Sequence, residues 1–70
     1  MIGSHILNRG RLKFRTAGAV LAQEALQAKS ASRDFTVRLA SNNRAVTGKV
    51  LNVELIESVE PAQWEIVMRV

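Results

Sequence analysis

The residues with the clearest chemical potential are four cations that alternate along one stretch near the N-terminus. In the segment NRGRLKFRT, positive side chains occupy every second position, at Arg9, Arg11, Lys13 and Arg15. Alternate side chains of a strand point the same way and repeat at about 6.5–7 Å, close to the phosphate spacing along a single nucleic-acid strand. The pattern therefore predicts a cationic strand face that can follow a phosphate backbone.

A second interpretation of these cations requires no ligand. Lys and Arg on an edge strand prevent sheets from pairing edge to edge, so the charges could serve only to keep the protein monodisperse. Phe14 and Trp64 are expected to face the core, because each alternates with polar residues in its segment. Exposed aromatics for base stacking are therefore not predicted, and any nucleic-acid contact would lack base-specific readout.

The positive charge is concentrated in the first half of the chain. The formal net charge is +4, and residues 1–35 contain six of the ten Lys and Arg but only Glu24 and Asp34 as acids. Such asymmetry indicates an anionic partner on one surface. Arg33, Arg38 and Arg44 are candidates to support the strand cations there.

Catalysis and metal binding find little support in the composition. The chain has no cysteine, and His5 is its one histidine, so neither a nucleophile with its base nor a Cys/His metal site is available. The four glycines are too dispersed to form a phosphate-cradling loop. We expect a protein that is not an enzyme and that has no cofactor, no metal and no small-molecule substrate.

The N-terminus and the hydropathy bear on organisation and location. Gly3-Ser4-His5 is typical of a cloned tag, so residues 1–8 are interpreted as a tag-derived or flexible segment of one small domain spanning 1–70. No apolar run approaches the roughly 20 residues that span a bilayer. We expect a cytoplasmic protein without a membrane partner.

Residues 17–30 are predicted to form a helix, because Ala, Leu, Gln and Glu dominate the segment and Thr16 is placed to cap it. Ala22 and Leu26 lie on a minor side of this helix. Leu26 is therefore either a scattered surface leucine or an interface residue. The broad buried stripe is expected to comprise Ala17, Val20, Leu21, Ala25 and Ala28.

The remaining segments are predicted to be strands. Residues 8–16, 35–40 and 63–70 alternate between apolar and polar side chains, and Ser41-Asn42-Asn43 favours a hairpin turn. Residues 45–57 are either a helix or a strand, and β-branched residues favour a strand. Its apolar phase changes between Val50 and Leu51, which indicates a β-bulge.

These elements predict an α+β fold with one helix packed on a mainly antiparallel sheet. The order is β-α-β-β-β, and the last three strands form a meander. A 70-residue chain without disulfides has little core of its own, so we expect a homo-oligomer.

Short stretches are similar to two known families. GRLKFRTAGAVLAQEAL, followed by FTVRL and AVTGK, looks like the phosphocarrier protein HPr. Lys13 stands where that family carries its phosphorylated histidine, and Thr16 replaces the usual proline, so phosphotransfer does not carry over. LKFR, VLN and EIVMRV are similar to the C-terminal ribosome-binding domain of bacterial translation initiation factor three, which implies RNA contact by Lys13 and Arg15. Both resemblances consist of separate short words, and we assign the chain to neither family.

The leading prediction is a small non-catalytic module that contacts RNA or DNA phosphates. The alternative is a structural or protein-interaction module that self-associates through an apolar helix face or a sheet edge and has no nucleic-acid ligand. A chain with no evolved ligand is a third interpretation.

Overall fold

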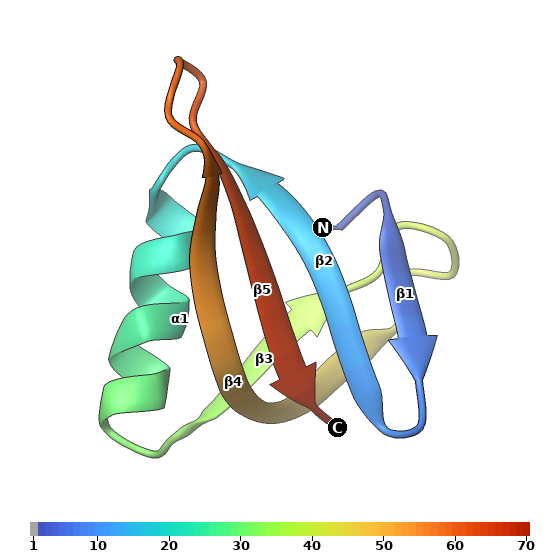
Figure 1. Ribbon diagram of the computed structural model, residues 1–70. Helices are drawn as coiled ribbons and strands as arrows, with labels where there is room; N and C mark the ends of the chain where they lie inside the picture. Colours follow the sequence, from blue (N-terminus) through green and yellow to red (C-terminus); the bar gives the residue numbers. More distant parts are fainter. Residues whose placement is uncertain (1) are drawn as a thin grey trace.

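The computed structural model describes residues 2–70, which form one helix and five strands (Figure 1). In chain order these are β1 (His5–Asn8), β2 (Arg11–Ala17), α1 (Val20–Ser30), β3 (Asp34–Arg38), β4 (Ala45–Glu57) and β5 (Gln63–Arg69). The strands form a single antiparallel sheet in the order β1-β2-β5-β4-β3. The predicted α+β fold, the order β-α-β-β-β from β2 onward and the closing meander are confirmed.

β1 is an additional strand, because the sequence predicts a single strand over residues 8–16 and no element before it. It pairs with β2 from His5 opposite Phe14 to Asn8 opposite Arg11. The two-residue turn between them, Arg9 and Gly10, has positive φ at both positions, as such hairpins require. Residues 5–8 are thus part of the sheet, and residue 1 lies outside the described part of the chain.

The sheet curls, so that the segment before β1 meets the end of β3. Ile2 forms a parallel bridge with Leu39. Its N–H donates to the carbonyl of Arg38 and its carbonyl accepts the N–H of Ala40, both at 2.7 Å. The helix packs mainly against β4. One face of the curled sheet therefore surrounds the core and the other, which we call the outer face, is turned to solvent.

The core consists of the inward residues of the strands and the buried side of α1. In β2 and β5 the predicted alternation is confirmed, because Phe14 and Ile66 are buried while their strand neighbours face outward. Trp64 shares the inward face but is only partly buried. The apolar core cluster comprises Ile2, Leu12, Phe14, Ala25, Ala28, Phe35, Val37, Leu39, Val50, Ile66 and Met68.

The start and the buried side of α1 differ from the prediction. Thr16 remains in β2, opposite Trp64, and Ala19 precedes the helix without a side-chain cap, so the predicted Thr16 cap is wrong. Val20 is 74% exposed, whereas Ala22 is fully buried. The three buried residues, Ala22, Ala25 and Ala28, are all small and bring the helix close to the sheet. The helix therefore buries the side whose small residues allow close packing, and Val20 faces solvent although its side chain is larger and apolar.

β4 is one long strand, so the strand interpretation of residues 45–57 is confirmed and the helical alternative is wrong. Its pairing with β5 shifts register between Val50 and Asn52, which is the position of the predicted bulge. Gly48 permits a close approach of the two strands, because a Cβ there would collide with the carbonyl oxygen of Arg69.

Candidate nucleic-acid interface

The cations of β2 lie on the outer face, as the alternation predicts. Arg11, Lys13 and Arg15 are exposed on β2. Arg9 is also exposed, but it lies with Gly10 in the β1–β2 turn, so its predicted place on the strand is wrong. β1 and β5 pair with β2 on either side, so β2 is not an edge strand. Protection of a sheet edge therefore does not account for these charges.

Carboxylates compensate the positive charges of Lys13 and Arg15, in the half of β2 that leads toward α1. Glu65 stands opposite Arg15 on β5, and its oxygens lie 3.6 Å from Lys13 Nζ and 3.6 Å from Arg15 Nε. Glu54 on β4 is the next residue in the same cross-strand row. A polyanion at Lys13 and Arg15 would thus also meet two carboxylates, which weakens this half of the predicted strand face.

The other half of β2 joins a row of cations that crosses the strands. Arg11 pairs in register with Arg69 on β5, and Arg69 pairs with Lys49 on β4. All three side chains belong to the outer face. Since neighbouring strands are about 4.8 Å apart, the row spans about 10 Å. It runs at right angles to the direction that the sequence predicts.

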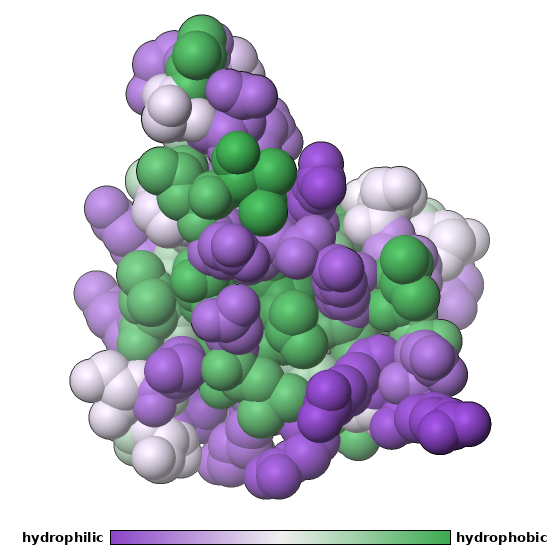
Figure 2. All heavy atoms as spheres, viewed as in Figure 1, coloured by the Kyte–Doolittle hydropathy of each residue, from purple (hydrophilic) through white to green (hydrophobic). Residues whose placement is uncertain are grey.

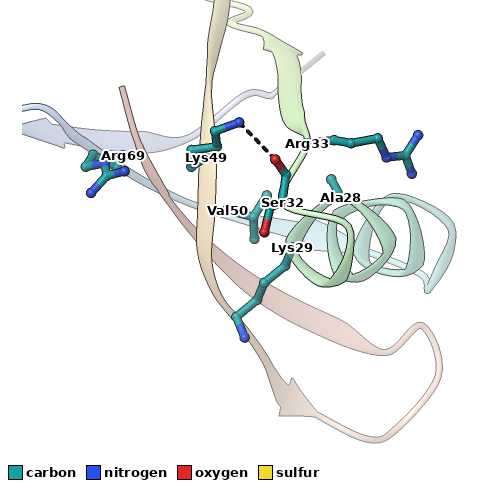
Figure 3. Close-up of a pocket in the computed structure, with 7 residues that line it drawn as sticks. All are labelled: Ala28, Lys29, Ser32, Arg33, Lys49, Val50 and Arg69. Carbon is teal, nitrogen blue, oxygen red and sulfur yellow. Dashed lines mark hydrogen bonds between the residues drawn. The ribbon is translucent and has the colours of Figure 1, made fainter.

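A hollow of about 280 Å³ continues this row from the sheet to the C-terminal end of α1 (Figure 3). Four of its seven lining residues are cations and none is acidic. Lys49 reaches toward the Ser32 carbonyl, while Lys29 and Arg33 extend outward from the end of the helix. The lining residues are Ala28, Lys29, Ser32, Arg33, Lys49, Val50 and Arg69.

The cations of the row and of the hollow, together with Arg9 in the turn before Arg11, are called the basic belt: Arg9, Arg11, Lys29, Arg33, Lys49 and Arg69. Lys49 is engaged, because its Nζ lies 2.8 Å from Asp34 Oδ1 and donates to the Ser32 carbonyl at 3.0 Å. Within residues 2–70 the other five cations form no ion pair. No carboxylate within residues 2–70 therefore compensates the charge of these five cations.

Four of the predicted site residues are outside the belt: Lys13 and Arg15 on β2, Arg38 at the end of β3, and Arg44 just before β4. Arg38 is on β3, which β5 and β4 separate from β2 in the sheet. Its guanidinium donates to the carbonyl of Asn43 at 2.8 Å, and Arg44 lies in the same β3–β4 connection. Arg38 and Arg44 therefore do not extend the strand cations.

The belt thus contains Arg9, Arg11 and Arg33 from the predicted set and adds three residues that the sequence did not single out. Lys29, Lys49 and Arg69 are far apart along the chain and meet through strand pairing and helix packing. A signal for two of them was present, because Lys49 and Arg69 occupy outward positions of alternating segments.

Other kinds of site find no counterpart in the described part of the chain. In residues 2–70 no three His, Cys, Asp or Glu side chains gather in a way that could hold a metal ion. No helix there has the length and apolar character to cross a membrane. No family model matches the chain, and neither a curated protein nor a solved structure matches it.

Proposed function

We propose that the protein is a non-catalytic binding module that contacts the phosphates of single-stranded RNA or DNA through the basic belt. The observation that supports this most directly is the register of Arg11, Arg69 and Lys49, which puts cations from three strands in one row. Phosphates attract such a row regardless of base sequence, since each contact releases condensed counterions.

The aromatic residues support contact with the backbone rather than with the bases. Phe14 is 2% exposed, and the indole nitrogen of Trp64 is buried. Single-strand binders that hold bases use exposed aromatic rings as stacking platforms, whereas here Phe14 is buried and Trp64 is only partly exposed. We therefore expect the belt to recognise the charged backbone of a flexible single strand and not its bases.

The salt dependence of binding tests this proposal. Each phosphate contact with a single strand contributes about −0.7 to the slope of log K against log salt, so five free cations predict a slope of about −3.5. The assay is fluorescence anisotropy of a labelled oligouridylate titrated at several salt concentrations. A peptide nucleic acid of the same bases is the control, and it should not bind because its backbone is neutral. The proposal would be refuted if the affinity did not depend on salt, or if the oligouridylate and the peptide nucleic acid bound equally well.

Self-association is a second candidate function, favoured by apolar side chains on the surface. Leu26, the interface residue that the sequence predicts, is 43% exposed on α1. Ile6 and Leu7 are exposed on β1, at the free edge of the sheet. A larger apolar group lies at the end of the strands remote from the belt.

A further inference from the structure

The β4–β5 hairpin and the start of α1 carry a group of exposed apolar side chains. The hairpin projects beyond the core, at the opposite end of the strands from the β1–β2 turn (Figure 1). Figure 2 shows hydrophobic atoms gathered on the projecting hairpin and where it leaves the sheet. Gly18, just before α1, donates its N–H to the Ala62 carbonyl at 2.8 Å and ties the two segments together. We call this group, whose members are 39–74% exposed, the hairpin patch: Val20, Leu55, Ile56 and Val59.

Carboxylates surround the hairpin patch. Glu54 and Glu57 lie on the last part of β4, Glu60 lies in the hairpin loop and Glu65 lies near the start of β5. Glu24 is one helical turn from Val20 and lies on the same side of α1. All five glutamates of the chain thus belong to this end, and of these only Glu65, beside Lys13 and Arg15, forms ion pairs within residues 2–70. The basic belt occupies the other end of the strands.

We infer that a second copy of this chain docks its basic belt on the hairpin patch, so that copies associate head to tail. The two ends of one molecule have complementary charge, which favours this orientation over belt against belt or patch against patch. Apolar surface also lies next to the belt, because Val70, the chain neighbour of Arg69, is 42% exposed. The N–H of Val70 donates to the carbonyl of Gly10 in the turn that contains Arg9.

A head-to-tail contact uses two different surfaces of each copy. Each bound copy keeps one free belt or one free patch, so association continues into chains or closes into rings. The average mass should therefore rise steadily with concentration instead of stopping at a dimer. Charge orients the contact, so salt should weaken it: the Debye length falls from roughly 20 Å at 0.02 M salt to roughly 4 Å at 0.5 M.

Sedimentation velocity of the full chain at low and high salt is the first part of the test. We expect species heavier than the monomer at low salt and a return to the monomer at high salt. Purely monomeric behaviour at low salt, or association that strengthens with salt, would overturn the inference.

Complementation between two variants is the second part. Val59→Glu damages the patch and Arg69→Glu damages the belt, and both positions are exposed, so the fold should persist by circular dichroism. Each variant alone should be monomeric, whereas an equimolar mixture should form a one-to-one complex through the one intact belt and the one intact patch. A mixture that stays monomeric refutes a head-to-tail contact. The control is Leu26→Glu on α1, outside the patch, which should associate like the unmodified chain; loss of association there would assign the contact to Leu26 instead.

Discussion

Replacing Arg11 and Arg69 together by alanine should weaken binding to a single strand and flatten its salt dependence. The two residues are register partners in the belt, and neither forms an ion pair within residues 2–70. Losing two phosphate contacts lowers the magnitude of the slope by about 1.4, from about 3.5 to about 2.1. At about 0.1 M salt the same relation gives an affinity loss of about 25-fold.

The matched control for this variant is Arg38→Ala combined with Arg44→Ala. It removes the same net charge at the far end of β3, where Arg38 pairs with Ala45, whereas the belt residue Lys49 pairs with Asp34 at the start of that strand. Anisotropy with the labelled oligouridylate should give nearly the unmodified slope for this control. Equal losses of slope in the two double variants would mean that net charge, and not the belt, governs binding, and the reasoning from register would be refuted.

A third pair separates the belt from the strand face that the sequence predicts. Lys13→Ala combined with Arg15→Ala also removes two charges, but both side chains lie 3.6 Å from Glu65 and are already compensated. The slope should change by less than about half as much as in the belt variant. A larger change of slope than in the belt variant would show that the binding site runs along β2, as the sequence predicts.

Three substitutions test the packing that positions the belt, each by urea unfolding. Gly48→Ala would force a Cβ into the carbonyl oxygen of Arg69 and should cost about 2 kcal/mol or more, while the control Gly3→Ala meets no atom within 4 Å and should be nearly neutral. Met68→Ala empties a fully buried site and should cost about 2–5 kcal/mol; a loss below about 1 kcal/mol would contradict its place in the core. Trp64→Phe should change stability by less than about 1 kcal/mol, because removing an indole N–H that has no partner in residues 2–70 offsets the lost ring area.

Local alternation was sufficient to predict most of the sheet. Leu12 and Phe14 alternate with cations whichever strand lies next to them, so the outward face of β2 follows from the sequence. The bulge in β4 follows from the change of apolar phase at Val50, since a strand keeps its buried side facing the core. Both features depend on a single segment and its contact with one core.

The belt could not be predicted, because it depends on which strands are neighbours. Lys49 and Arg69 are 20 positions apart in sequence, and only the pairing of β4 with β5 brings them together. The same strand order separates Arg38 from β2. The predicted start of α1 was wrong for a related reason. Ala17 is a good helix former, but its pairing with Gln63 keeps it in β2.

Both proposals use the basic belt, so one copy cannot bind a nucleic-acid strand and dock its belt on a second copy at the same time. A phosphate strand that covers Arg11 and Arg69 leaves no belt free to dock on the hairpin patch of a second copy. Adding the oligouridylate to the associated protein at low salt should therefore dissolve the assemblies into small protein–oligonucleotide complexes, observed by sedimentation with absorbance of the label. The peptide nucleic acid should leave the assemblies intact, since it offers no charge to compete. Assemblies that keep their mass while carrying the oligouridylate would show that binding and association use separate surfaces, and one of the two assigned contacts would have to move.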